Sequence, residues 1–361
     1  MPRNDEFLYM LRNANPIETV MGSYVQLIRR GRNYVCSCPF HSEKTPSCTV
    51  FTDTQSFYCF GCGAGGDVIT FTMKIENLDF TEAVKLLAQR SGLEIPQNDS
   101  ADSQLAHRKT RIYEMNRIAA NFFYTNLFKG KDKSGLQYFA GRKLTPQTVK
   151  KYGLGYASDS WDELTRLLSA KGYSDDEIVD AWLGGRSKKG NLFDMFRHRV
   201  MFPIIDLRGN IIGFGGRVLD GSQPKYLNTG NTPVFNKGNN LFSMNFAKNA
   251  AVKDKTILLC EGNLDVISLN QAGFENAVAS CGTALTPEQA KIISNYADNV
   301  VICYDADGAG QKATTRAIKI LGETGLKTTV IKMNGAKDPD EYINKFGADH
   351  FRHLLKKSDG A

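Results

Sequence analysis

The chain has 361 residues, more than one ordinary domain holds, so two or three domains are expected. Hydrophobic residues make up 42% and charged residues 23%, the balance of a soluble globular protein, and no apolar run is long enough to span a bilayer. The net charge is +7, but residues 186–253 alone hold eleven Lys or Arg against three acids, a local net of +8. This basic block favours a polyanionic partner, although charge alone predicts a solvated basic face equally well.

The first region, residues 1–96, carries five of the eight cysteines and is predicted to fold around zinc. Cys38 and His41 form one pair of soft ligands separated by two residues, and Cys59 and Cys62 form a second. Two tight turns of this kind complete a tetrahedron with no open position, which predicts one structural zinc ion. Cys36 is an alternative to Cys38, with a longer spacing to His41. The neighbouring aromatic residues could stack on bases or form the core of the module.

A helix is expected after Asp79, where Asp79 and Glu82 form a capping pattern and Gly92 follows the last turn. Residues 97–109 are polar and lack periodicity, so we expect a flexible linker. The second region, 110–253, begins with helical spacing of apolar residues from Ile112 and later becomes strand-like. Helices are expected near 145–152, 161–171 and 174–183, and strands at 199–206 and 211–219, joined by a short turn.

The third region, 254–361, alternates short apolar strands with helical segments, which predicts βαβ units and a mainly parallel sheet. The strands are expected at 256–260, 277–280, 300–305 and 328–333, and the helices near 264–272, 287–296, 309–323 and 339–355. The predicted fold class is therefore mixed α+β and α/β. It comprises an N-terminal zinc ribbon, a basic α+β subdomain and a C-terminal α/β domain.

Acidic residues follow three of the predicted parallel strands. They are Glu261, Asp265, Asp305, Asp307, Asp338 and Asp340. Ligands of such sheets gather beyond the carboxyl ends of the strands, so these side chains are expected to converge. A cluster of like charges favours hard cations, and two-metal nucleotidyl transfer with Mg²⁺ is the chemistry that fits. For any single Asp the alternative is a helix N-cap or a turn residue, most of all for Asp338 and Asp340.

Three stretches resemble one known family. YVCSCPFHSEKTPSCTV with FYCFGCGAGGDVITF looks like the zinc-binding domain of bacterial DNA primases, whose ligand set falls on Cys38, His41, Cys59 and Cys62. Cys48 stands where that family commonly has an aromatic residue. The acidic pattern resembles the TOPRIM domain, and RVMFPIIDLRGNIIGFGGRVL with PKYLNTGNTPVFNKGNNLF resembles the N-terminal half of the primase polymerase core. The resemblance implies that template or nucleotide phosphates bind Arg142, Arg199, Arg217, Lys225, Tyr226 and Lys237.

The resemblance as a whole implies a DNA primase that makes short RNA primers on single-stranded DNA from ribonucleoside triphosphates. It implies one structural Zn²⁺ and two or more catalytic Mg²⁺, with Mn²⁺ as an alternative. We expect a monomer in the cytoplasm, at the replication fork, without membrane contact. Family members continue past the TOPRIM domain to a helicase-binding domain, and this chain stops at Ala361. Weak or absent binding to the replicative helicase is therefore expected, with low intrinsic activity.

Two other classes of function are alternatives to a primase. The first is another TOPRIM enzyme, a nuclease or a topoisomerase. A topoisomerase needs a transesterifying Tyr in a large gate-forming domain, for which the chain has no room. The second is a non-catalytic DNA-binding module, which suits the zinc and basic regions but leaves six clustered carboxylates unexplained.

Overall fold

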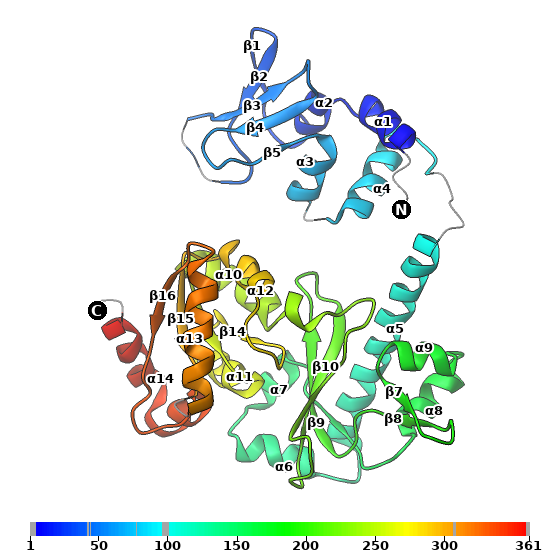
Figure 1. The fold of residues 1–361 in the computed structure, drawn as a ribbon, viewed down its shortest axis with the longest axis vertical. Coiled ribbons are helices and arrows are strands. Elements are labelled where there is room, and N and C mark those ends of the chain that lie inside the picture. The colour runs from blue at the N-terminus through cyan, green and yellow to red at the C-terminus, as the bar shows by residue number, and fades with distance from the viewer. Residues whose placement is uncertain are drawn as a thin grey trace. The chain divides into compact units, whose positions relative to one another are not determined.

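The structure is a computed structural model that describes residues 5–41, 43, 45–76, 78–95, 101–305 and 308–358. The chain divides into two compact units, Met1–Gln104 and Leu105–Ala361 (Figure 1). Across these described ranges, no helix combines the length and the apolar character that a membrane crossing requires.

An antiparallel sheet of five strands, in the order β1-β2-β3-β4-β5, forms the centre of the first unit. Its strands are β1 (Ile28–Arg30), β2 (Asn33–Cys36), β3 (Cys48–Phe51), β4 (Ser56–Cys59) and β5 (Gly65–Gly66). The helices of this unit are α1 (Asp5–Ala14), α2 (Ile17–Met21), α3 (Val68–Ile75) and α4 (Phe80–Ser91). Buried aromatic rings hold helix to sheet, because Phe57 of β4 meets Phe71 of α3 edge to face with centroids 5.5 Å apart.

The helix predicted after Asp79 is confirmed as α4. The Asp79 carboxylate accepts a hydrogen bond from the Glu82 N–H at 2.9 Å, and the Glu82 carboxylate accepts one from the Asp79 N–H at 3.0 Å. Gly92 ends the helix in the left-handed conformation, with φ of 67°, which costs glycine less than any other residue. The start and the end of α4 could therefore both be predicted from the residues at its two ends.

The predicted flexible linker is wrong over residues 101–109, which form the first turns of the long helix α5 (Ala101–Lys129); residues 97–100 lie outside the described part of the chain. The segment is polar but has good helix formers and neither Gly nor Pro, so a helix seeded by the buried residues further on extends through it. Arg108 also binds both carboxylate oxygens of Asp180, at 3.1 and 2.7 Å.

The middle of the chain builds a four-stranded antiparallel sheet in the order β11-β10-β9-β6. Its strands are β6 (Gly155–Ala157), β9 (Arg199–Ile205), β10 (Ile211–Val218) and β11 (Tyr226–Asn228), and beside it lies the hairpin of β7 (Gly184–Arg186) and β8 (Leu192–Asp194). The helices are α6 (Ser134–Gly141), α7 (Pro146–Lys151), α8 (Glu163–Ala170) and α9 (Asp175–Asp180), with the 3₁₀ turn η1 (Lys237–Asn239). The predicted strand pair at 199–206 and 211–219 is confirmed as β9 and β10.

The C-terminal sheet has the order β12-β14-β13-β15-β16, parallel except for its first strand. Its strands are β12 (Leu241–Phe242), β13 (Thr256–Cys260), β14 (Ala277–Ser280), β15 (Asn299–Cys303) and β16 (Lys327–Val330). Its helices are α10 (Met244–Asp254), α11 (Asn263–Gln271), α12 (Pro287–Ser294), α13 (Gly308–Gly322) and α14 (Pro339–Ser358). The parallel strands and the mixed fold class are confirmed. Two elements were not predicted, namely β12, which is only two residues long, and α10.

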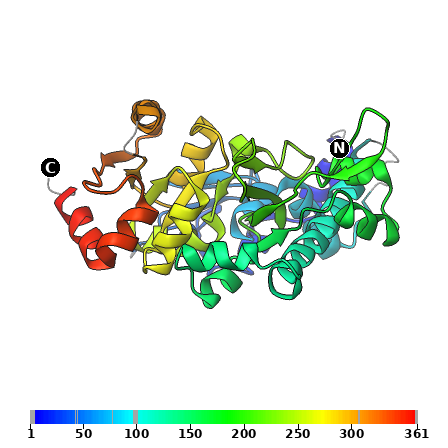
Figure 2. The same ribbon diagram turned by 90° about the horizontal axis from the view of Figure 1, so that it is seen from below.

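Helices cover both faces of this sheet, because successive side chains along each strand point to opposite faces. Ile257 and Leu259 pack in one buried cluster with α10, α12 and α13, whereas Leu258 and Cys260 pack in another with α11 and α14. Figure 2 shows α13 (orange) and α14 (red) on opposite sides of the strands. Because β13, β14, β15 and β16 run parallel, their carboxyl ends lie at one common edge, which is where ligands of such sheets bind.

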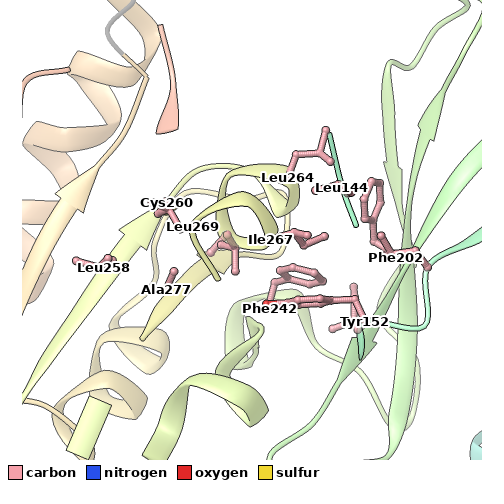
Figure 3. Packing of buried hydrophobic residues seen from close by; sticks show 14 of the residues in the cluster. Leu144, Tyr152, Phe202, Phe242, Leu258, Cys260, Leu264, Ile267, Leu269 and Ala277 are labelled. Carbon is pink, nitrogen blue, oxygen red and sulfur yellow. The ribbon is translucent and has the colours of Figure 1, made fainter. Parts of the chain in front are cut away.

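One buried cluster joins the middle sheet to the C-terminal sheet (Figure 3). Tyr152, after α7, stacks on Phe242 of β12 with centroids 6.0 Å apart, and Phe202 of β9 belongs to the same cluster as Ile267 of α11. Each large apolar side chain buried in this way stabilises the fold by about 1.5–3 kcal/mol. The shared core holds the two sheets as one body, so that side chains on their facing edges keep fixed positions.

A bidentate ion pair fastens α5 to α9, and it predicts a pH dependence of stability. Arg111 donates to both carboxylate oxygens of Glu177, at 2.6 and 3.0 Å, and this contact lowers the pKa of Glu177 to about 2. Because the folded-state pKa lies below the unfolded value near 4.5, the stabilisation is complete above pH 4.5 and is lost as the pH falls toward 2. Glu177→Gln keeps the capping contact with Ser174 and is expected to lower the unfolding free energy by about 1 kcal/mol at pH 7.

Urea unfolding of the wild type and Glu177→Gln at pH 7 and pH 3 measures this effect. The difference between the two proteins should shrink at pH 3, because Glu177 is then mostly protonated in the unfolded wild type and folding must release that proton. Asp176→Asn is the control, since the Asp176 side chain is 91% exposed and should change stability by no more than about 0.5 kcal/mol. A difference that stays constant between the two pH values would contradict the prediction.

Candidate functional site

The structure brings the four predicted zinc ligands together. Their donor atoms, from Cys38, His41, Cys59 and Cys62, all lie within 4.8 Å of one another. The Cys38 and Cys62 sulfurs are 3.7 Å apart, and the Cys59 sulfur lies 3.8 Å from His41 Nδ1. Two thiolates about 2.3 Å from a tetrahedral ion stand about 3.8 Å apart, so the donor set fits zinc in both chemistry and size.

Glu43 and Ser47 support this donor set, and the sequence analysis missed both. The Glu43 carboxylate lies 3.1 Å from His41 Nε2, which leaves Nδ1 for the metal. It also accepts hydrogen bonds from the Cys38 N–H at 2.7 Å and the Ser47 N–H at 3.0 Å, and the Ser47 hydroxyl meets both Glu43 and the Cys59 sulfur. Burial raises the pKa of Cys59, but Ser47 and the N–H groups of Cys62 and Gly61 outweigh it and lower the pKa to about 6.

Cys36 and Cys48 lie outside the donor group. They face each other across β2 and β3, and Cys48 faces Cys59 across β3 and β4. Both are buried, and in the sheet they act as small apolar residues.

The acidic residues of the C-terminal sheet fall into two environments. Glu261 follows β13 and Asp305 follows β15, and both are partly exposed at the common edge of the sheet, where the Asp305 N–H donates to the Glu261 carboxylate at 3.2 Å. We call this edge the acidic crest. Asp307 lies outside the described residues. A side chain at Gly310 would come within 2.9 Å of the Glu261 carboxylate and closer still to the Asp305 carbonyl, so only glycine fits beneath the crest.

Asp265 lies behind the crest and is 7% exposed. Its carboxylate accepts hydrogen bonds from the Gly262 and Asp340 N–H groups, both at 3.2 Å. Burial raises the pKa of Asp265 well above its ordinary value, and the negative charges of Asp338 and Asp305 raise it further. The carboxylates from three strand ends are therefore near enough to repel one another, and oxygen ligands in that arrangement suit a divalent cation. Within the described ranges, only the zinc ligands gather three or more donor atoms within 4.8 Å.

Asp338 acts as a helix N-cap, the alternative raised for it from the sequence. Its carboxylate accepts a hydrogen bond from the Glu341 N–H at 2.7 Å, in the first turn of α14, and its other oxygen lies 4.0 Å from the Lys337 ammonium. The side chain is 17% exposed, so part of it remains accessible to solvent.

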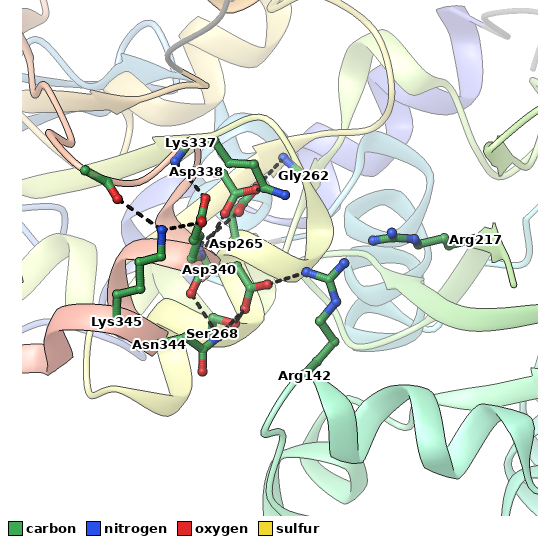
Figure 4. Close-up of polar contacts among 12 residues, drawn as sticks. Arg142, Arg217, Gly262, Asp265, Ser268, Lys337, Asp338, Asp340, Asn344 and Lys345 are labelled. Atoms are coloured by element: carbon green, nitrogen blue, oxygen red, sulfur yellow. Dashed lines mark hydrogen bonds and ion pairs between the residues drawn. The ribbon is translucent and has the colours of Figure 1, made fainter. Parts of the chain in front are cut away.

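Asp340 is surrounded by donors instead (Figure 4). Arg142 donates to Oδ2 at 2.6 Å, and Ser268 and Asn344 donate to Oδ1 at 2.5 and 3.0 Å. Its side chain is 4% exposed. Although burial opposes it, the neighbouring Tyr138 and Asp340 raise the pKa of Arg142, which stays charged.

Predicted phosphate-binding residues gather beside this edge of the sheet. The Arg217 guanidinium lies 5.1 Å from the ring centroid of Tyr138 and 5.4 Å from that of Tyr226, and it donates to the Tyr226 hydroxyl at 3.1 Å. Lys225 lies 5.9 Å from the same Tyr226 ring. Gly215 allows β10 to lie close to the start of α11, because a side chain at position 215 would come within 2.8 Å of the Asn263 amide.

Arg199 and Lys237 occupy different surroundings. Arg199 is 6% exposed and donates only to the Gly216 and Lys225 carbonyls, at 3.3 and 3.4 Å, among the described residues. Burial lowers the pKa of Arg199, and the charge of Arg197 lowers it further, so an anion near Arg199 would relieve this cost. Lys237 begins η1 and is partly exposed.

An exposed aromatic platform was not found from the sequence. Trp161 is 65% exposed, and the Arg197 guanidinium lies 4.2 Å from the ring centroid of Trp161 and 5.3 Å from that of Phe193. The buried Asp194 fixes the platform, because its N–H donates to the Trp161 carbonyl at 2.7 Å. The signal was weak, since one tryptophan and one arginine 36 positions apart reveal no contact.

Comparisons with known proteins agree with this arrangement. Residues 3–103 match the CHC2 zinc finger family, residues 122–248 the DNA primase catalytic core, N-terminal domain, and residues 258–343 the Toprim-like family. The Cys–His–Cys–Cys set is accordingly the zinc site of a CHC2 finger, and a Toprim domain implies a divalent metal.

The similar proteins that we compared are primases. A DNA primase of Clostridium acetobutylicum is 44% identical over 98% of this chain and 59% of its own length, and the chain spans less than two thirds of the curated relatives it matches. The Aquifex aeolicus primase, zinc-binding and RNA polymerase domains, is 34% identical over 98% of this chain and 85% of that structure, with a TM-score of 0.65. A DnaG primase catalytic domain bound to single-stranded DNA is 31% identical over 70% and 83%, also at 0.65. The chain therefore belongs to the DnaG-type DNA primase family.

Proposed function

We propose that this chain synthesises short RNA primers on single-stranded DNA by nucleotidyl transfer from ribonucleoside triphosphates. The observation that carries the proposal is the meeting of two opposite charges within one packed body. The acidic crest around Glu261 and Asp305 lies beside Arg142, Arg217 and Lys225, which we call the basic edge. Arg142 joins the two through Asp340. A metal-dependent nuclease shares the crest, but the basic edge is what holds a template together with a triphosphate.

The carboxylates of the crest would hold the catalytic cations. Glu261, Asp305 and Asp338 would do so directly, with Asp307 completing the set and Asp265 behind it, for two or more Mg²⁺ or Mn²⁺ ions. Bound there, the cations would activate the 3′-hydroxyl of the primer and neutralise charge on the departing pyrophosphate. Carboxylate and water ligands suit both ions, so the site accepts either.

The basic residues would bind and orient the two polyanions. Arg142 binds Asp340, and Arg217 lies at the same Tyr138 ring as Arg142. These two would hold the triphosphate, because a guanidinium offers a fork of donors to phosphate oxygens. Arg199, Lys225, Tyr226 and Lys237 would bind the phosphates of the template. Trp161 and Arg197 would stack on an unpaired base, as exposed aromatic side chains do in single-strand binding proteins.

The zinc module would serve template selection and not catalysis. Its four protein ligands leave no open position on the ion, so the zinc is structural. The exposed rings of Tyr58 and Phe60, 5.1 Å apart at the second ligand turn, offer a surface for bases. A replication-fork location, a monomeric state and weak helicase binding stay predictions.

The test is a primer-synthesis assay with single-stranded DNA, labelled ribonucleoside triphosphates and Mg²⁺. We expect oligoribonucleotides that depend on the template and on the metal, and that alkali destroys. Cleavage of the DNA strand without synthesis would instead assign the crest to a nuclease. Double-stranded DNA of the same sequence is the control, and it should support no product.

A further inference from the structure

We propose that Asp340 is a positioning residue that anchors Arg142 for a nucleoside triphosphate, and that Ser268 and Asn344 fix its carboxylate for that purpose. The inference rests on the proposed function, because it takes the triphosphate as the ligand of Arg142. It separates Asp340 from the carboxylates that bind cations, with which the sequence pattern had grouped it.

The Asp340 carboxylate is already occupied by protein donors. Oδ1 receives hydrogen bonds from Ser268 at 2.5 Å and from Asn344 at 3.0 Å, which use both of its lone pairs. Oδ2 receives the Arg142 guanidinium at 2.6 Å. Three of the four lone-pair sites of this carboxylate are therefore in use, and a cation could reach only the second lone pair of Oδ2, beside the Arg142 guanidinium, whose positive charge would repel it.

Burial points the same way. The Asp340 side chain is 4% exposed, whereas that of Asp338 is 17% exposed and Glu261 and Asp305 are partly exposed at the crest. Mg²⁺ loses its water reluctantly and usually keeps several water ligands, which requires space around the carboxylate. Asp340 has donors where those waters would stand.

Arg142 contacts both Asp340 and the Tyr138 ring, and these contacts fix its guanidinium in a position to bind phosphate. Its guanidinium carbon lies 5.5 Å from the Tyr138 ring centroid, and the Arg217 guanidinium lies 5.1 Å from the same ring. Figure 4 shows both guanidinium groups extending toward the carboxylates. The contact with Asp340 is made by Nη1, so the other donors of the fork remain to bind phosphate oxygens.

Two cations beside one ring repel each other unless an anion lies near them. Asp340 supplies one charge, and the triphosphate would supply the rest. The Tyr138 side chain is enclosed beside both guanidinium groups and keeps them at one place in the fold. The pair of arginines is therefore fixed before the nucleotide binds, and less ordering is needed on binding.

Binding measurements on the full chain test the inference without relying on turnover. Mn²⁺ affinity is measured by electron paramagnetic resonance, and nucleotide affinity by the fluorescence of a labelled ATP at saturating Mn²⁺. We compare Asp340→Asn and Ser268→Ala with Asp305→Asn. Ser294→Ala serves as the matched control, because its hydroxyl bonds only its own helix at Lys291 among the described residues.

Asp340→Asn should weaken nucleotide binding about tenfold, because a charged hydrogen bond to Arg142 is lost. Ser268→Ala should weaken it about threefold, and both variants should keep Mn²⁺ affinity within about twofold of wild type. Asp305→Asn should weaken Mn²⁺ binding at least about tenfold. In primer synthesis the two anchor variants should raise KM for the nucleotide more than they lower kcat.

Two outcomes would overturn the inference. If Asp340→Asn weakens Mn²⁺ binding as much as Asp305→Asn does, then Asp340 is a metal ligand. If nucleotide affinity is unchanged in Asp340→Asn and Ser268→Ala, then Arg142 needs no anchor. Mn²⁺ affinity and nucleotide affinity can both be measured on a chain that makes no primers. A failure of the proposed function can therefore be told apart from a failure of this inference. Circular dichroism of each variant shows whether the fold has been kept, and Ser268→Ala remains informative where Asp340→Asn unfolds.

Discussion

Asp305→Asn is expected to reduce primer synthesis at least about a thousandfold while the fold stays intact. The substitution keeps the size of the side chain and removes one negative charge from the crest, where it lies beside Glu261. A cation that loses a carboxylate ligand is bound less tightly and less well placed, and about 4 kcal/mol of lost transition-state stabilisation corresponds to that factor. The measurement is the rate of labelled oligoribonucleotide formation at saturating template and nucleotide.

Asp298→Asn is the matched control, because Asp298 and Asp305 flank the same strand, β15, at opposite ends. Asp298 is largely exposed and lies 3.8 Å from the Lys255 ammonium, far from the common carboxyl edge of the sheet. The control should keep wild-type activity within about twofold. Raised Mg²⁺ should restore part of the activity of Asp305→Asn if the loss is one of affinity. Full activity of Asp305→Asn at ordinary Mg²⁺ would show that the acidic crest does not bind the catalytic cations.

The parts of the fold that follow from short-range rules were predictable. The capping box at Asp79 and Glu82 and the left-handed Gly92 defined α4, and runs of buried apolar residues defined the parallel strands β13, β14 and β15. The start of α5 was not predictable in this way, because polar residues with good helix propensity look the same in a linker and in a helix extension. Strand β12 has only two residues, too few to show an alternation.

In the candidate site, too, the features set by local sequence could be predicted, and those set by long-range packing could not. The zinc ligands stand in two short motifs, and the crest residues each follow a strand, so local pattern indicated both. The partners of Asp340 could not be found, because Arg142 and Ser268 are 198 and 72 positions away. Ser268 meets Asp340 only through the packing of α11 against α14, and Arg142 reaches it from the end of α6. Glu43 could have been proposed from the sequence, since a metal-bound histidine commonly bonds a carboxylate through its second ring nitrogen and Glu43 is close to His41 in the chain.

Removal of zinc is expected to unfold the first unit and leave the second folded. The module is small, and its buried core is shared with two of the ligands, Cys38 and Cys59. Structural zinc in modules of this size contributes about 10 kcal/mol of folding free energy, more than such a core supplies by itself. A strong chelator, or Cys59→Ala, should therefore abolish the cooperative unfolding of the first unit and expose it to protease. The second unit has its own core and should keep its melting transition.

Cys36→Ala is the matched control for the cysteine substitution. Cys36 is buried in the same sheet but lies outside the donor group, so its loss should cost about 1 kcal/mol and leave one zinc per chain. Zinc content is measured by elemental analysis, and the fold of each unit by limited proteolysis with mass spectrometry. If Cys59→Ala lost its zinc but kept a protease-resistant first unit, the apolar core would be sufficient. Because the proposed nucleotide site lies within the second unit, the zinc-free chain should retain nucleotide binding and lose preference for particular template sites.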